Sequence, residues 1–215
     1  ELAALRMVSA HVKVVVKGLR ALLLQNDETT LDAKKPFEPF GKAPAVGSRL
    51  RIGHPEVVTK RLGSLTFRFR WMGAPPDLAA HYASYVRADK SRLVDTNSLT
   101  SRICLIDRNE EKKLTCEARL FGRDPAVETS IEIAGLSEVT NLESISPGSL
   151  GAELSTWRRH LQWELDGSDF GHGVYPALAS ARAMALAAAI ANKQPETGVV
   201  AADYQVNPPY TPKLK

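Results

Sequence analysis

The sequence predicts a mainly-β fold, an antiparallel β-sandwich with two helices as a minor α component. Two observations predict it. Apolar and polar residues alternate with a period of two in several short segments, as they do in half-buried strands. Turn-forming residues separate these segments, and few stretches show a helical period. Two antiparallel sheets packed face to face would bury the apolar residues of all these segments between them.

The clearest strand is predicted from Leu65 to Trp71, where apolar residues alternate with threonine and arginine. We therefore expect Phe69, in the middle of this pattern, to be a core residue. Residues 101–107 are apolar on both faces, which is typical of a strand covered on both sides. The short polar link that follows predicts a hairpin with residues 113–120. Further strands are expected at 12–16, 19–24, 49–52, 130–134 and 161–165.

Two helices are predicted, near residues 76–86 and 175–192. The first begins at Pro76, which favours a first helical turn. The second is rich in alanine, and Pro195 follows it as a stop signal. Small side chains let another backbone approach closely, so we expect one face to pack either on the sheet or on a neighbouring subunit. The alanines of this face are Ala177, Ala181, Ala185 and Ala188.

The segment 36–48 is too rich in proline and glycine for regular structure, yet it contains Phe37 and Phe40. We interpret it as an ordered strap that these aromatic residues pin down. The expected organisation is then a β segment at 1–35, the strap, a main sandwich domain at 49–194 and an extended linker at 195–215. Since the chain opens at Glu1 and closes on a proline-rich segment, we expect a fragment of a larger protein.

Composition and charge are those of an ordinary globular protein. The 215 residues are 44% hydrophobic and 24% charged, and the net charge is +4. Because the basic residues are dispersed over many segments instead of lying on one stripe, we expect no nucleic-acid partner. The longest apolar stretch, 174–191, is interrupted by Arg182 and dominated by alanine, so we expect no membrane span.

The sequence offers no arrangement of residues that would carry catalysis. It has no phosphate-binding loop, no dinucleotide-binding glycine motif and no nucleophile elbow. The histidines lie singly, and we assign the densest group of possible ligands to a strand end and a turn. That group consists of His160, Asp166, Asp169 and His172. We therefore expect a non-enzymatic protein with no catalytic residue, no cofactor and no metal.

Two cysteines, Cys104 and Cys116, flank the predicted hairpin turn. If the strand register centres on Glu110, they face each other across the strands, and a disulfide is geometrically allowed. The alternative is a pair of reduced thiols in a protein made in a reducing cytoplasm, and we favour this alternative.

The candidates for a partner interface are Phe37, Phe40, Trp157, Arg158 and Tyr210. A second interpretation is a carbohydrate-binding or adhesin-like β-sandwich that contacts a target surface. It requires two or three coplanar aromatic rings exposed in a groove. Burial of all three tryptophans would remove its support.

A series of short strings in the sequence resembles the large baseplate proteins of contractile, phage-tail-like injection systems, from about residue 19 to the end. In order, they are Pro36–Gly41, Pro44, Val46–Ser48, Arg51–Gly53, Glu56, Lys60–Leu62, Leu65–Trp71, Pro75, Tyr82, Tyr85, Leu120–Phe121, Asp169–Pro176 and Pro208–Pro212. Residues 135–152 match nothing in that family.

This resemblance implies a non-enzymatic structural module of a J-like or neighbouring wedge protein, with no catalytic residues to carry over. It implies docking to other baseplate and tail-tube subunits, and an oligomeric arrangement in the assembled particle. The implied location is the bacterial cytoplasm during assembly, and then a particle that can be released from the cell.

Overall fold

The computed structural model describes residues 13–87, 89–107, 111–121, 129–138, 140, 151, 153–192 and 201–214. Strand residues outnumber helical residues, 31% against 21%, and the sheets are antiparallel, which confirms the mainly-β class. The strands are β1 Leu23–Asn26, β2 Thr30–Leu31, β3 Arg49–Gly53, β4 Leu65–Phe69, β5 Trp71–Met72, β6 Leu99–Asp107, β7 Glu111–Arg119, β8 Thr129–Ile133, β9 Arg159–Gly167 and β10 Lys213–Leu214. The helices are α1 Pro55–Thr59, α2 Leu78–His81 and α3 Tyr175–Ala191, with short 3-10 turns η2 Thr96–Ser98, η3 Leu136–Glu138, η5 Leu154–Thr156 and η6 Ala201–Tyr204.

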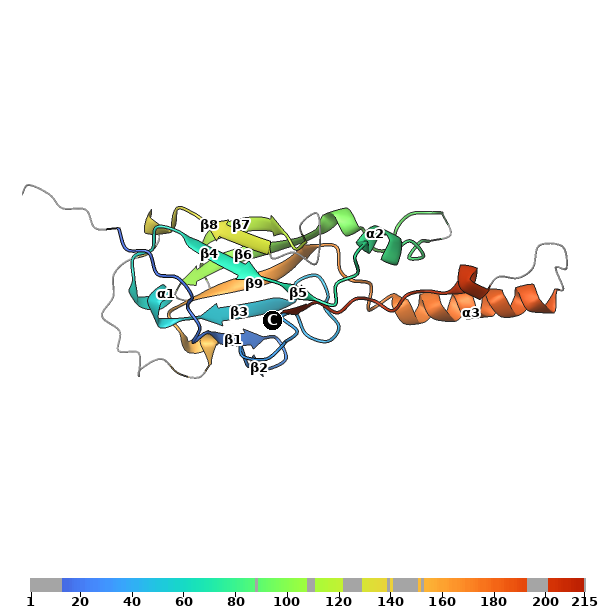
Figure 1. Cartoon of the computed structure of the whole chain (residues 1–215), viewed down its shortest axis with the longest axis horizontal. Helices are drawn as coiled ribbons and strands as arrows, with labels where there is room; N and C mark the ends of the chain where they lie inside the picture. The colour runs from blue at the N-terminus through green and yellow to red at the C-terminus, as the bar shows by residue number, and fades with distance from the viewer. Residues whose placement is uncertain are drawn as a thin grey trace, which may run out of the picture.

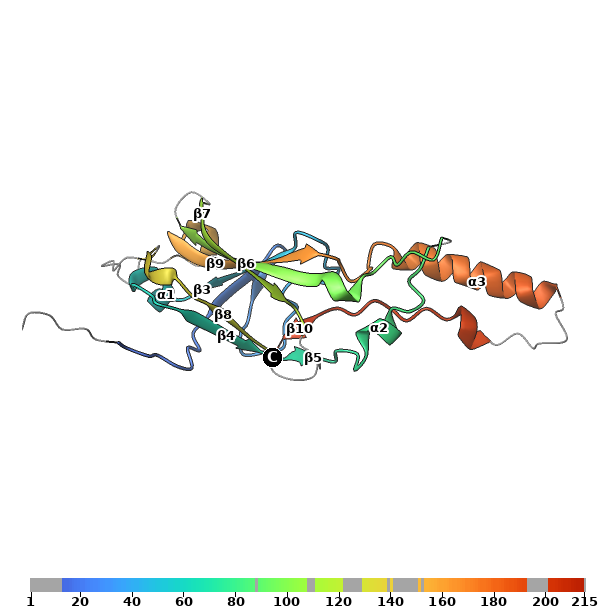
Figure 2. The same ribbon diagram turned by 90° about the horizontal axis from the view of Figure 1, so that it is seen from above.

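The strands form two layers. In the described part of the chain, one layer is a six-stranded sheet in the order β2-β1-β3-β9-β6-β7. The other layer consists of two antiparallel ribbons, β4-β8 and β5-β10, which lie on one side of the large sheet (Figures 1 and 2). This arrangement is the sandwich that the alternating sequence pattern predicts.

Aromatic rings fill the space between the two layers. The Trp163 ring, from β9, lies 4.9 Å from the Phe69 ring and 5.9 Å from the Trp71 ring, measured between centroids. Phe40, from the strap, contacts Trp163 edge-on at 5.3 Å. The indole N–H of Trp71 donates to the carbonyl of Leu120 at 2.7 Å, so its polar atom is satisfied inside the core. Phe69 is therefore a core residue, as the sequence predicts.

The strap at 36–48 crosses from β2 to β3 and is anchored to the end of the chain. The Phe37 N–H donates to the Leu214 carbonyl at 3.1 Å, and the Leu214 N–H donates to the Phe37 carbonyl at 2.9 Å. Phe40 is buried, whereas Phe37 is half-buried. Two segments that were expected to lie outside the sandwich contribute strands to it, β1 and β2 before the strap and β10 at the C-terminal end.

Two local predictions were wrong. Residues 13–20 form no strand although 12–16 alternate suitably, and Val14, Val15 and Val16 are 57–75% exposed. Alternation produces a strand only where a neighbouring strand supplies backbone hydrogen bonds, and no described strand pairs with this segment. The helix expected at 76–86 is only α2, because Leu93 donates to the Tyr85 carbonyl and Val86 forms an antiparallel bridge with Arg92.

The β6–β7 hairpin is present, but its register is not the one that would set the two cysteines opposite each other. Cys104 lies opposite Thr115, and Cys116 lies opposite Ile103. The strand register therefore does not centre on Glu110, and an irregularity between Leu105 and Ile106 shifts the rest of the ladder by one further residue. Both cysteines are free thiols, the alternative that the sequence favours.

Candidate docking surface

The helix α3 projects from one end of the sandwich as an arm, and the segment 201–212 runs back along it to β10 (Figures 1 and 2). Among its 17 residues the only charged side chain is that of Arg182. No residue of α3 is buried, and Met184 and Ile190 are 70% and 61% exposed. A helix that is apolar on all sides is ordinarily buried in a core or an interface. In the described part of the chain, α3 instead lies on the outside of the fold with no fully buried residue.

One face of α3 is partly covered. Its half-buried residues follow a helical period, and η6 lies beside the helix. They are Tyr175, Leu178, Ala179, Arg182, Leu186 and Ala189. The face on the other side of the helix has no cover from the described residues. We call the exposed apolar residues of α3, from Ala177 to Ala191, the arm surface.

A tight turn between β9 and α3 fixes the direction of the arm. Gly171 has φ +78°, a conformation that favours glycine. A Cβ atom there would lie 2.8 Å from Val94 Cγ2 and 2.9 Å from Tyr85 Cε1, so any other residue would force these buried side chains to shift. The adjacent Phe170 is fully buried against Phe121, with ring centroids 6.1 Å apart. The base of the arm is therefore rigidly packed on the sandwich.

Side chains from α2 and the turn after it hold the returning C-terminal segment in place. The Tyr85 hydroxyl donates to the Asn207 carbonyl at 2.7 Å, and the Tyr82 hydroxyl accepts from the Tyr210 N–H at 3.0 Å. His81 Nε2 donates to the Pro208 carbonyl at 3.0 Å. Burial raises the pKa of the Tyr85 phenol to about 12, so this hydroxyl stays protonated and remains a donor at neutral pH. These bonds explain why a segment without regular structure follows a fixed course.

We predict that acidification weakens this attachment through His172, whose Nε2 lies 2.9 Å from Thr211 Oγ1. Burial lowers the pKa of this imidazole below its ordinary value of 6.5, and its Nδ1 has no hydrogen-bond partner in the described part of the chain. The unfolded chain therefore binds the proton more readily than the folded chain. The stabilisation is complete above about pH 6.5 and is lost as pH falls from there toward the folded pKa.

Thermal unfolding at about pH 7.5 and about pH 5 tests this prediction in the parent protein and in His172→Gln. The variant does not titrate at this position, so its melting temperature should fall less on acidification than that of the parent. Burial also lowers the pKa of His54, but His54 titrates in both proteins and its effect cancels. An equal fall in the two proteins would contradict the prediction.

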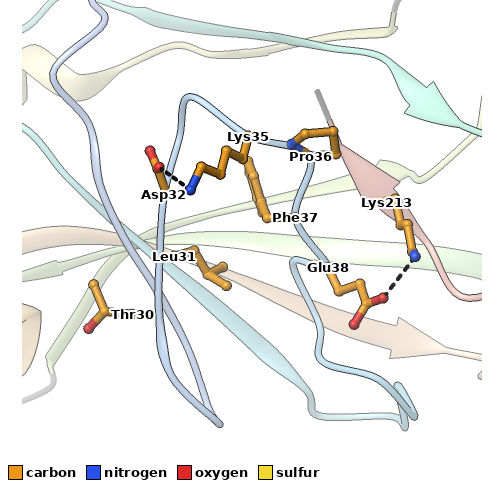
Figure 3. A pocket seen from close by; sticks show the side chains of 8 residues that line it. All are labelled: Thr30, Leu31, Asp32, Lys35, Pro36, Phe37, Glu38 and Lys213. Atoms are coloured by element: carbon orange, nitrogen blue, oxygen red, sulfur yellow. Dashed lines mark ion pairs between the residues drawn. The ribbon is translucent and has the colours of Figure 1, made fainter.

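An open depression of about 400 Å³ lies beside the strap (Figure 3). Leu31 and Phe37 supply its apolar part. Two ion pairs border it, Lys35 Nζ to Asp32 Oδ2 at 3.8 Å and Lys213 Nζ to Glu38 Oε1 at 3.1 Å. Because the charges at its rim are already matched with one another, the depression shows no preference for an anionic or a cationic ligand.

The residues predicted for a partner interface lie in different parts of the fold. Phe40, Trp157 and Tyr210 are 4%, 9% and 8% exposed, so their rings pack inside this chain. Phe37 is half-buried at the depression, and Arg158 is half-buried with its Nε 3.5 Å from Asp107 Oδ1. They do not gather into one surface. The small side chains of α3 indicated a close-packed face, but they did not indicate Met184 and Ile190. The scarcity of charge along the helix is the signal in the sequence that points to these two residues.

The described residues contain no group of three or more histidine, cysteine, aspartate or glutamate side chains that could hold a metal ion. Within the same residues, no helix has the length and apolar character that crossing a membrane requires.

Comparison with protein families gives a match over nearly the whole chain. A family described as "Baseplate protein PVC11-like" matches residues 3–213. A comparison with curated proteins finds no significant match. The family match supports the resemblance seen in the sequence at the level of a baseplate protein of a phage-tail-like system. Since it spans both the sandwich and the α3 arm, the chain belongs to the PVC11-like family of baseplate proteins.

Proposed function

We propose that this chain is a non-enzymatic docking module of a J-like wedge component in a contractile, phage-tail-like particle. The observation that carries the proposal is the arm surface, a projecting apolar helix with no buried residue. Its partners are other baseplate and tail-tube subunits, with which it forms an oligomeric assembly. Assembly takes place in the bacterial cytoplasm, before release of the particle.

The physical reason for docking is the hydrophobic effect. Removing apolar surface from water stabilises an association by about 25 cal/mol per Å². Met184 and Ile190 contribute little to the stability of the isolated chain, because their side chains remain mostly in water. If a neighbouring subunit covered these side chains, the burial would stabilise the complex. The rigid turn at Gly171 and the anchored C-terminal segment would hold the arm ready for it.

The carbohydrate-binding alternative requires exposed tryptophan rings, and all three tryptophans are buried. Trp71, Trp157 and Trp163 are 3%, 9% and 3% exposed. Their rings pack inside the chain and present no groove of exposed, coplanar aromatic faces. A structural role therefore has the stronger support.

We predict that a protein with the double substitution Met184→Lys, Ile190→Lys is not incorporated into the baseplate. Both side chains are exposed, so the isolated variant should keep its circular dichroism and its melting temperature. Two lysines on the arm surface would have to be desolvated on docking, which opposes association. Incorporation is measured by purifying particles and detecting the subunit in them.

Val46→Lys is the matched control. Val46 is an exposed apolar residue, 54% accessible, but it lies in the strap. Particles should contain this variant at the parent level. Normal incorporation of the double variant, or equal loss with the control, would contradict docking through the arm surface.

A further inference from the structure

We propose that residues 13–17 form a β-strand that pairs with the outer edge of β7 in a second copy of this chain. This contact lies on a different surface from the arm surface and goes beyond the proposed docking function. Two features carry it: a strand-like segment that has no partner strand, and a long strand edge that no strand covers. Each copy contains both features, so copies join head to tail.

The segment 13–17 has the composition of a strand without the surroundings of one. Its sequence is Lys-Val-Val-Val-Lys, and the valines at 14, 15 and 16 are 75%, 65% and 57% exposed. In the described part of the chain, its backbone groups make no hydrogen bond. β-branched residues favour an extended backbone, whose N–H and C=O groups need a neighbouring strand. The partner that satisfies both the side chains and the backbone is therefore the edge of a β-sheet.

β7 ends the large sheet and offers such an edge. It pairs with β6 on one side, and no described strand pairs with its other side. β7 has nine residues, whereas every other strand that ends a described ladder has five or fewer. An edge of this length presents a row of unpaired backbone groups to an incoming strand.

The core-facing side chains of β7 are incompletely covered. Cys116 and Ala118 pack against the core, yet both are only half-buried. The residues opposite them on β6, Ile103 and Ser101, are 2% and 0% exposed. β6 is covered because β7 lies beside it, and a further strand beside β7 would cover β7 in the same way.

The alternation within residues 13–17 supplies the side chains that this position needs. In an extended backbone, Val14 and Val16 point to one face and the two lysines point to the other. The two valines can therefore lie beside Cys116 and Ala118 and extend the core. The lysines then stay in water on the outer face of the sheet, where Glu117 is also exposed.

The segment cannot reach the β7 edge of its own chain. Three strands, β3, β9 and β6, separate β1 from β7. A strand beyond β7 is five spacings from β1, or about 24 Å at about 4.8 Å each. Leu22 packs against the core, and the chain from Leu22 back to Lys17 spans at most about 18 Å. The dark blue segment also lies apart from β7 in both views (Figures 1 and 2).

A second copy fits better than an unlike subunit, because one kind of contact then satisfies both features. In a head-to-tail row, each copy donates its segment to one neighbour and accepts the segment of the other. An unlike partner that accepted the segment would leave the β7 edge uncovered. Because the contact is heterologous, association continues beyond a dimer, into a closed ring or an open row.

Sedimentation of the isolated chain over a wide concentration range tests the pairing. We expect association that rises with concentration. The double variant Val15→Pro, Val16→Pro should weaken it by about tenfold or more, because proline lacks the N–H of the ladder. Adjacent N–H groups point to opposite edges of a strand, so one of the two prolines faces β7 in any register. Both positions lie outside every described helix and strand, so the fold should be kept.

Val15→Ile, Val16→Ile is the matched control. Isoleucine keeps the N–H group, the β-branched shape and the apolar character, so this variant should associate like the parent. A chain that stays monomeric at all concentrations would overturn the pairing, and so would equal association of the proline and isoleucine variants.

Disulfide trapping at the native Cys116 tests which face of the segment docks. Oxidised glutathione is added to Val14→Cys and, separately, to Val15→Cys. Position 14 shares the core-facing side with Cys116 and position 15 does not, so the first variant should link to Cys116 of a second chain about tenfold faster. Peptide mapping by mass spectrometry identifies the link, and Cys116→Ser should abolish it. Equal rates in the two variants would contradict the proposed arrangement.

Hydrogen exchange separates a second copy from an unlike acceptor. If the isolated chain stays monomeric while the amides of residues 13–17 become protected in particles, the acceptor is another subunit and self-pairing is overturned. The variant Met184→Lys, Ile190→Lys should associate like the parent, because both side chains lie on α3. Loss of its association would overturn pairing through β7, whereas its entry into particles bears on the proposed function alone.

Discussion

Replacing Phe69 by alanine is expected to lower the free energy of unfolding by about 3–5 kcal/mol. Phe69 is 9% exposed and lies between the two layers of the sandwich. Its ring centroid is 5.3 Å from that of Trp71 and 4.9 Å from that of Trp163. The substitution removes both aromatic contacts and leaves a cavity where the β4-β8 ribbon meets the large sheet. Chemical denaturation followed by tryptophan fluorescence measures the loss.

The matched control for this variant is Arg68→Ala, which changes the adjacent residue on the exposed face of β4. Its effect should stay within about 0.5 kcal/mol, because it alters no packed contact. If Phe69→Ala were as mild as this control, the two layers would not be packed through Phe69.

Replacing Arg159 by alanine is expected to cost about 3–5 kcal/mol of stability, because it breaks a buried ion pair. Arg159 is 1% exposed, and its Nη2 lies 3.6 Å from Asp107 Oδ2. These residues face each other across β9 and β6. Arg159 Nη1 also donates to the Val58 carbonyl at 3.1 Å and the Val57 carbonyl at 3.4 Å, which ties α1 to the sheet. Alanine leaves these carbonyls and part of the Asp107 charge without a donor.

An ion pair whose arginine is exposed provides the comparison for Arg159→Ala. Arg49 Nε lies 3.5 Å from Glu164 Oε2, and the Arg49 side chain is 45% exposed. Arg49→Ala should therefore cost less than about 1 kcal/mol, because solvent screens this pair. Thermal or chemical unfolding of both variants gives the two values. Similar losses would mean that burial does not strengthen the Arg159 pair.

Most of the sandwich could be predicted from the sequence because its strands have one buried and one exposed face. The alternation at 65–71 locates β4 and β5, and the segments 49–52, 101–107 and 161–165 locate β3, β6 and β9. The helix α3 was predicted almost to the residue, since proline marks its start and its alanines favour helix. These signals are local, so they can be read from the sequence alone.

The errors came from interactions between distant residues. A suitable alternation at 12–16 gave no strand, because strand formation depends on a partner elsewhere in the chain. The hairpin register is set by backbone pairing along the whole ladder, so residue spacing alone left open whether Cys104 and Cys116 lie opposite each other. Local periodicity indicates neither whether a partner strand is present nor which register a hairpin adopts.

Only part of the docking surface could be predicted from the sequence. The alanines of α3 indicated close packing, but they left open whether the sheet or another subunit would cover them. The structure places the helix on a projecting arm, where the sheet cannot reach its outer face. Met184 and Ile190 then gain importance, because they are the large apolar side chains exposed on this arm.

Thiol labelling at the arm tests the docking account most directly. Met184→Cys and Val46→Cys are each introduced into the parent protein, and the rate of alkylation at each new cysteine is measured by mass spectrometry. In the isolated chain both positions are exposed, so both should react readily. In assembled particles we expect position 184 to be protected while position 46 provides the comparison for general access. Equal reactivity of position 184 in the free and assembled protein would show that α3 stays bare, and would contradict the account.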